Sequence, residues 1–319
     1  MTQDKPMFGI FLMLLFCIMA PFGDAVVKLI GERVALGEML VVRFAVQAVI
    51  LIPIVAMTGR KWRMSGRVLW LTLLRTVLHI VAIGFMFTGL QYLPLADAVA
   101  ITFVMPFIMM LLGHHFLGEE VGHRRLVACL FGFAGTLLVI QPSFVQFGWA
   151  ALLPLGVALT FSAFVLVTRQ IAKETDPIGL QAVSGLMATV MILPVLLIGA
   201  ANEVTLFNIA VFELSAPDAM TWALLIGAGL LGSFAHLMMT WALRYAPSAT
   251  LAPMQYLEIP FATFFGFAMF GTWPNQLATV GIAMTMTAGL FIVLREQSSA
   301  RKQSREEMME AEAAQHAAE

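Results

Sequence analysis

Charged residues are scarce in this sequence. Only 12% of its 319 residues are Asp, Glu, Lys or Arg, whereas 60% are hydrophobic, and the mean hydropathy is +0.90. Soluble domains usually contain about a quarter charged residues, so this composition excludes an ordinary soluble protein and predicts an integral membrane protein. The net charge of −1 offers no clustered basic surface, which argues against a nucleic-acid partner.

The sequence also lacks the motifs of several enzyme and pump classes. It contains no GxxxxGK[ST] phosphate-binding loop, no HExxH pair and no GxSxG nucleophile turn. An ATP-driven pump, a zinc protease and a serine hydrolase are therefore not expected. The two cysteines, Cys17 and Cys129, lie in apolar segments and form no motif, so no disulfide framework is predicted.

One cluster of His and Glu residues has a spacing that suits a metal ion. Its members are His114, His115, Glu119, Glu120 and His123. Gly118 and Gly122 interrupt the helix that would have to present them on one face. We therefore predict no metal site and no other cofactor.

Ten apolar stretches are long enough to cross a bilayer, which takes about 20 helical residues. They span residues 7–30, 38–58, 67–90, 94–117, 123–141, 148–169, 177–199, 219–243, 247–270 and 275–294. The first follows Lys5 and could be read as a signal peptide, but it is long for one and no small-residue cleavage site follows. We predict an all-α multi-pass membrane protein in which this stretch is retained as the first of ten transmembrane helices.

The basic residues predict the orientation. Most Lys and Arg fall into the connectors that share one side with the N-terminus, for example Arg60, Lys61 and Arg63, whereas the long loop 200–218 on the other side carries only acidic charges. Because basic loops stay in the cytoplasm, both termini are predicted to be cytoplasmic in the cell (inner) membrane.

Ten helices of alternating direction divide into two sets of five with opposite polarity. The sequence Tyr92-Leu93-Pro94 is echoed by Tyr245-Ala246-Pro247 in the second half. Transporters often build a central site from such inverted repeats. We predict a five-plus-five inverted repeat, with a first repeat at residues 1–143, a second at 144–295 and a polar cytosolic tail at 296–319.

A single carboxylate, Glu258, lies in the ninth stretch within the sequence APMQYLEIP. It is about 16 Å along the helix from Pro247, close to the middle of the bilayer. A charge there costs about 2.5–3.5 kcal/mol, so it persists where a cavity or partner receives it. Glu258 is predicted to carry protons or to face a cationic substrate; the alternative is a structural ion pair with an arginine. Tyr256 is a weaker candidate, because on an ideal helix it points to another face.

Arg75 and His79 lie four residues apart in the third stretch and share one helix face. Their depths bracket that of Glu258. A guanidinium beside an imidazole suits a substrate carboxylate or phosphate. The alternative for Arg75 is that it simply neutralises Glu258.

Three further side chains are candidates for the same site. Asp24 is deep in the first stretch, although Lys28 four residues later predicts an intrahelical ion pair. Arg43 is shallow enough to extend towards water and anchor the second stretch, or to line a vestibule. His236 in the eighth stretch is either a packing histidine or a ligand contact.

The segment Leu93 to Glu120, LPLADAVAITFVMPFIMMLLGHHFLGEE, resembles the fourth helix of EamA-type transporters of the drug/metabolite transporter superfamily. Arg43-Phe44 and Leu257-Glu258-Ile259-Pro260 are similar to family positions as well, and the resemblance covers about residues 7 to 294. One departure is Gly271-Thr272, where the family often repeats the Gly118-Glu119 pair. The resemblance implies ten helices in two inverted halves and secondary transport of a small metabolite.

These observations predict a secondary active transporter in a lipid bilayer, as a monomer or homodimer. Its substrate is expected to be a small polar metabolite, such as an amino acid, an amine, or a nucleotide-related or vitamin-like compound. Transport would proceed by alternating access, driven by protons or exchange. An intramembrane enzyme and a non-transporting receptor or channel remain as alternatives.

Overall fold

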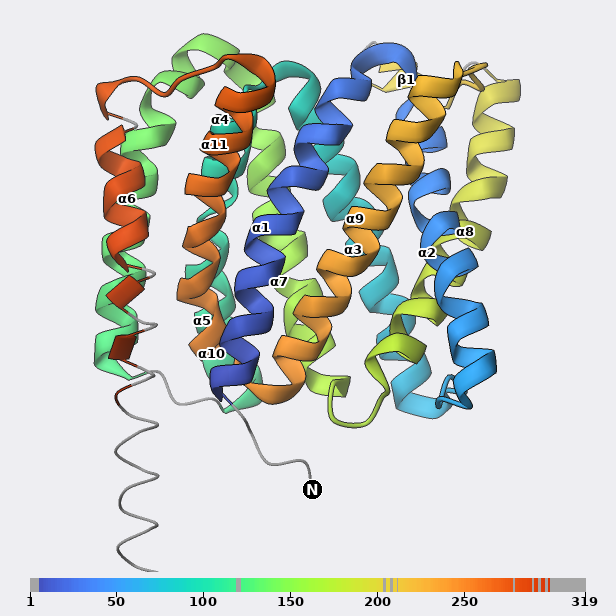
Figure 1. Ribbon diagram of the computed structural model, residues 1–319, viewed down its shortest axis with the longest axis horizontal. Helices are drawn as coiled ribbons and strands as arrows, with labels where there is room; N and C mark the ends of the chain where they lie inside the picture. The colour runs from blue at the N-terminus through green and yellow to red at the C-terminus, as the bar shows by residue number, and fades with distance from the viewer. Residues whose placement is uncertain are drawn as a thin grey trace, which may run out of the picture.

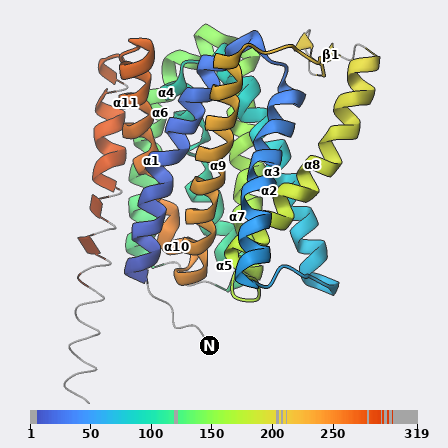
Figure 2. The same ribbon diagram turned by 45° about the vertical axis from the view of Figure 1, so that its right-hand side comes forward.

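The computed structural model is a bundle of helices that run up and down beside one another (Figures 1 and 2). It describes residues 6–118, 122–202, 205–206, 209–210, 212–277, 279–288, 290–291, 294–295 and 298. Glu119 and Glu120 of the His and Glu cluster lie outside these residues, as does almost all of the polar tail.

The helices follow the apolar stretches of the sequence. They are α1 (Pro6–Ile30), α2 (Leu36–Thr58), α3 (Gly66–Tyr92), α4 (Leu95–Thr102), α5 (Met105–Leu117), α6 (His123–Phe147), α7 (Leu153–Ile171), α8 (Pro177–Ala201), α9 (Ala219–Tyr245), α10 (Ser248–Leu251) and α11 (Glu258–Phe270). Short 3₁₀ turns are η1 (Gly31–Arg33), η2 (Gly148–Leu152) and η3 (Ala252–Leu257). The loop after α8 holds two antiparallel strands, β1 (Thr205–Leu206) and β2 (Ile209–Ala210).

Seven helices of the described chain are long and apolar enough to cross a membrane, counting α4 with α5 as one and η2 with α7 as another. Two shorter apolar helices, Leu126–Leu138 and Thr279–Ala288, pack together where Gly135 contacts the backbone of Gly281. Large apolar side chains such as Val49, Trp70 and Leu159 are mostly exposed on the outside of the bundle, as a lipid-facing surface requires. The prediction of an all-α multi-pass membrane protein is confirmed.

Two of the predicted spans are broken in the middle. The fourth divides between α4 and α5 just before Pro106, and the ninth consists of α10, η3 and α11. Both begin after a proline in extended conformation, Pro94 (φ −55°, ψ 147°) and Pro247 (φ −59°, ψ 148°). Both end at a glycine with positive φ, Gly118 and Gly271. Interrupted helices at membrane depth are tolerated where they are buried in protein or line a cavity.

The helix contacts place the two broken spans beside each other, because α4 contacts α11. α1 packs along α9, α3 along α7, and α2 along α8, while α11 contacts α1 and α5 contacts α7. In Figure 1, α1 begins at the lower end of the bundle, and the last coloured helical residues near 295 lie at that same end. The connectors between α2 and α3 and between α7 and α8 are at this end too, and the ion pairs Arg60–Asp176 and Arg67–Glu174 join them. We call this the basic end.

Candidate functional site

A cavity lies between α1, α2, α3, α4, α5, α7, α9 and α11. Its volume open to the centres of water molecules is about 90 Å³, and one water needs about 10–15 Å³ on this measure, so several fit. The side chains that line it are mainly apolar. Its lining consists of Phe16, Ala20, Gly23, Asp24, Val27, Arg43, Ala82, Ile83, Met86, Phe87, Val99, Thr102, Met105, Val157, Phe161, Ala228, Gly232, Ala235, His236 and Glu258.

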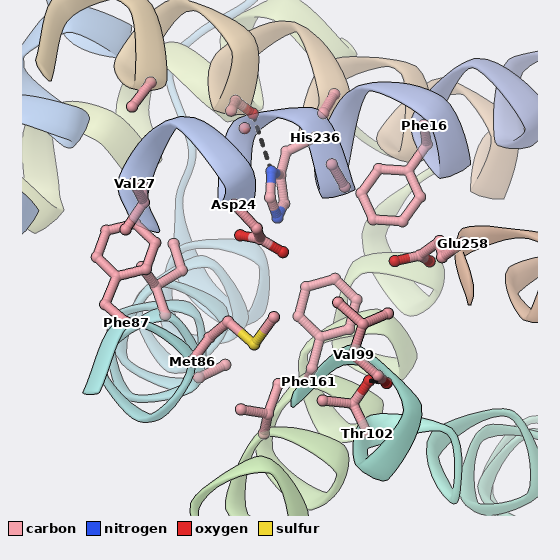
Figure 3. Close-up of a pocket in the computed structure, with 18 of the residues that line it drawn as sticks. Phe16, Asp24, Val27, Met86, Phe87, Val99, Thr102, Phe161, His236 and Glu258 are labelled. Atoms are coloured by element: carbon pink, nitrogen blue, oxygen red, sulfur yellow. Dashed lines mark hydrogen bonds between the residues drawn. The ribbon is translucent and has the colours of Figure 1, made fainter. Parts of the chain in front are cut away.

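Four ionisable side chains enter this apolar lining. Asp24 comes from α1, Arg43 from α2, His236 from α9 and Glu258 from the first residue of α11. Figure 3 shows the carboxylates of Asp24 and Glu258 directed into the same space from two sides, with the ring of His236 above Asp24. The structure therefore brings together residues that are far apart in the sequence but were predicted separately as site candidates.

Glu258 stands where the 3₁₀ turn η3 changes into α11. At this first helical position the positive end of the helix dipole favours a negative charge. Its Oε1 atom is buried and has no hydrogen-bond partner. The predicted alternative, an ion pair with an arginine, is wrong, because no arginine lies within 4.0 Å of this carboxylate in the described chain. Glu258 thus lines the cavity with a carboxylate of which one oxygen, Oε1, has no hydrogen-bond partner among the described residues.

Arg43 does not extend towards water as expected. The residue is only 7% exposed, and its Nη2 lies 3.3 Å from Nδ1 of His236. The guanidinium turns inwards because Gly232 on α9 leaves room for it; a Cβ at that glycine would overlap Arg43. Arg43 Nε is buried and has no hydrogen-bond partner among the residues described here. The Arg43 guanidinium therefore places a positive charge in the cavity wall.

His236 Nδ1 also lies 2.9 Å from the carbonyl oxygen of Gly232. A protonated Nδ1 donates to that carbonyl, and a bare Nδ1 accepts from Arg43, but one nitrogen cannot do both at once. The imidazole thus links the protonation of its ring to the position of Arg43. His236 thus both lines the cavity and contacts Arg43.

Asp24 is not paired within its own helix. The predicted ion pair with Lys28 is absent, because Lys28 Nζ instead donates to the carbonyls of Leu90 (2.9 Å) and Leu93 (2.7 Å) at the end of α3. Those carbonyls at a helix end need donors, and a lysine satisfies them. The Asp24 carboxylate is left to face the cavity near Arg43 and Glu258.

Three predicted site residues lie outside the cavity lining. Arg75 and His79 are fully buried beyond its wall, and Arg75 does not pair with Glu258. Tyr256 points away, because its hydroxyl donates to the carbonyl of Cys129 on α6 (3.0 Å) and its ring fills the space beside Gly132. Tyr256 faces α6, on a different side of its segment from Glu258, so the structure does not place Tyr256 in the cavity site.

Sequence reasoning missed the apolar part of the lining. Phe16, Phe87 and Phe161 supply rings, and Thr102 supplies a hydroxyl at the end of α4. With 25 phenylalanines in the chain, no pattern separates the lining rings from lipid-facing ones. Thr102 had a signal, since it precedes Pro106, where a helix break exposes side chains to a cavity.

Comparison with known proteins connects this architecture to transport. The EamA-like transporter family matches residues 7–141 and 148–295. A riboflavin transporter of Rhizobium johnstonii is 30% identical over 73% of this chain and 73% of its own, and one of Vibrio cholerae is 25% identical over 82% and 84%. An S-adenosylmethionine uptake transporter of Rickettsia prowazekii is 23% identical over 91% and 94%.

A solved protein structure superposes with a TM-score of 0.68 at 15% identity, covering 89% of this chain and 94% of that one. This likeness shows that the fold is shared. The family match extends over nearly all of the helical chain and confirms the resemblance seen in its fourth and ninth stretches. The chain belongs to the EamA-like transporter family of the drug/metabolite transporter superfamily.

Proposed function

We propose that the protein is a secondary active transporter that moves a small polar metabolite through the cavity by alternating access. The observation that carries this proposal is the group of Asp24, Arg43, His236 and Glu258 inside an apolar bundle. Ionisable residues are costly at membrane depth and mark substrate or ion pathways. Without a nucleotide-binding motif, the driving force is proposed to be protons or exchange.

A five-plus-five inverted repeat would support alternating access, and the helix contacts are compatible with one. An axis that exchanges the halves would match α1 with α7 and α3 with α9, so the α1–α9 contact would correspond to the α7–α3 contact. It would also match the two broken spans, each of which begins after a proline and ends at a positive-φ glycine. We propose repeats at residues 1–143 and 144–295 that rock against each other around the cavity.

The lining favours a substrate that joins a flat ring to a polar group. Phe16, Phe87 and Phe161 offer ring faces, and carboxylates, a guanidinium and an imidazole offer polar contacts. The names of the relatives, riboflavin and S-adenosylmethionine transporters, fit this class. We propose a vitamin-like or nucleotide-related metabolite as substrate, and a cell (inner) membrane location with the basic end in the cytoplasm.

Counterflow in proteoliposomes tests the proposed function. Vesicles loaded with unlabelled riboflavin or S-adenosylmethionine should accumulate the labelled compound transiently and saturably, because a carrier exchanges bound substrate across the membrane. Empty vesicles and vesicles without protein are the controls. Flux that rises linearly without saturation would indicate a channel, chemical conversion would indicate an enzyme, and binding without flux would indicate a receptor; each would contradict the proposal.

A further inference from the structure

A second polar cluster surrounds Arg75 beyond the cavity wall. The fully buried guanidinium donates from Nε to Thr168 Oγ1 (2.8 Å) and from Nη1 to Ser184 Oγ (2.7 Å), and its Nη2 lies 3.5 Å from Thr240 Oγ1. Gln181 donates to the same Thr240 oxygen (3.0 Å). We call these five residues the Arg75 cluster. It ties α3, α7, α8 and α9 together through one cation.

All of the hydrogen-bond partners in the Arg75 cluster are neutral. In the described part of the chain, the ion pairs within 4.0 Å join Arg60 to Asp176 and Arg67 to Glu174, away from Arg75. A buried cation without a counter-charge is one of the most costly features a membrane protein can carry. Its planar fork of donors matches a carboxylate or a phosphate, and hydroxyl partners can turn to donate to the same anion.

His79 connects the Arg75 cluster to the cavity. Its ring stacks on Phe164 at 4.5 Å, and the Arg75 guanidinium lies over that same ring at 4.6 Å. On its other side, His79 lies 4.3 Å from the ring of His236, which lines the cavity. Both ring nitrogens of His79 are buried and have no hydrogen-bond partner in the part of the chain that the structure describes. The imidazole of His79, which has no hydrogen-bond partner in the described chain, thus lies between the cavity and a guanidinium that has no counter-charge there.

The position of the cluster fits a path towards the basic end. Thr168 and Thr240 lie about 5 Å and 8 Å before the ends of α7 and α9, at the basic end of the bundle. Asp24 and Arg43 lie in the other half, about 9 Å and 10 Å from the opposite helix ends. His79 and His236 each lie four residues, about 6 Å, further from the basic end than Arg75 and Thr240 on the same helices. The Arg75 cluster therefore lies between these two histidines and the basic end.

We propose that the Arg75 cluster is a second binding site, which takes a carboxylate or phosphate group of the transported metabolite when the path opens towards the basic end. In the closed arrangement the hydroxyls of Thr168, Ser184 and Thr240 hold the guanidinium. An arriving anion replaces them, and His79 Nε2 or Nδ1 donates to it. This inference rests on the proposed transport function for its biological meaning, but its ligand chemistry is measured without transport.

Thermal unfolding of the purified full-length protein in detergent tests this site. Sodium phosphate and sodium acetate are compared with sodium chloride at equal ionic strength. At least one of the two anions is expected to raise the unfolding midpoint by a few degrees, because a ligand that binds only the folded state stabilises it. Arg75→Gln should lose this shift, and Arg43→Gln should keep it. General salting-out by phosphate acts on every variant alike and cancels in this comparison.

Arg75→Lys serves as the second variant, since it keeps the charge even if Arg75→Gln does not fold. It lacks the planar fork and should retain less than half of the anion-dependent shift. No shift in the wild type, a full shift in Arg75→Gln or Arg75→Lys, or a loss of the shift in Arg43→Gln would overturn the proposal. A clear shift without counterflow would support the anion site and contradict the proposed transport function. Counterflow without a shift would support the transport function and contradict the anion site.

Discussion

Glu258→Gln is expected to reduce substrate counterflow by about 100-fold, which corresponds to about 2.7 kcal/mol. The carboxylate is placed at the start of α11, faces the cavity and has a buried oxygen without a partner. The amide keeps the size of the side chain but can neither exchange a proton nor neutralise a cation. If transport is proton-coupled, the residual counterflow of Glu258→Gln should also become independent of pH.

The stability of Glu258→Gln should move in the opposite direction. An unpaired buried carboxylate lowers the free energy of unfolding, and a neutral amide of the same shape removes that cost. The unfolding midpoint should therefore stay the same or rise while transport falls, which is the signature of a residue kept for function. Unreduced and still pH-dependent transport by this variant would contradict the coupling role.

Glu38 provides the matched control for Glu258. It is also a buried glutamate, but its Oε2 accepts from the backbone N–H of Ser215 (3.0 Å) and from the Ser215 hydroxyl (2.6 Å). Glu38→Gln should lower the unfolding midpoint by weakening these charge-assisted bonds and leave counterflow close to that of the wild type. Comparable transport losses in both variants would mean that any buried glutamate matters only through the fold.

Much of the fold could be predicted because apolar length and flanking turns are local signals. The stretch 219–243 became α9 (Ala219–Tyr245), and 38–58 became α2 (Leu36–Thr58). The division of the stretch 94–117 into α4 and α5 was not predicted. The apolar sequence continues across Phe103 and Val104, whereas the helix is interrupted at these two residues. Prolines indicated where a break could fall but not that the chain would use it.

The part of the candidate site that could be predicted consists of residues whose charge is energetically costly in an apolar segment. Glu258 and Asp24 lie in apolar segments and face the cavity, as the cost of a membrane carboxylate implies. The direction of Arg43 could not be predicted, because it depends on a glycine in α9, a distant helix. Arg75 and His79 do share a buried face, but no sequence pattern places that face beyond the cavity wall rather than in it.

Gly232→Ala is expected to reduce counterflow by about 10- to 100-fold while the protein still folds. The new Cβ would occupy the position of the Arg43 guanidinium. Because the overlapping atoms belong to the end of a long side chain, Arg43 can move aside at the cost of about 1–3 kcal/mol, a range typical of overpacking. The displaced guanidinium loses its contact with His236 Nδ1 and its place beside Asp24.

Gly227→Ala is the control for this substitution, since it lies on the same helix and its new Cβ would meet no described residue within 4 Å. It should transport at the wild-type rate. Arg43→Gln should reproduce the loss seen in Gly232→Ala, and the double variant should transport no worse than Arg43→Gln alone, because both changes remove the same contact. Additive losses would show that Gly232 acts through helix packing instead, and the placement of Arg43 would then not be the reason for a glycine at this position.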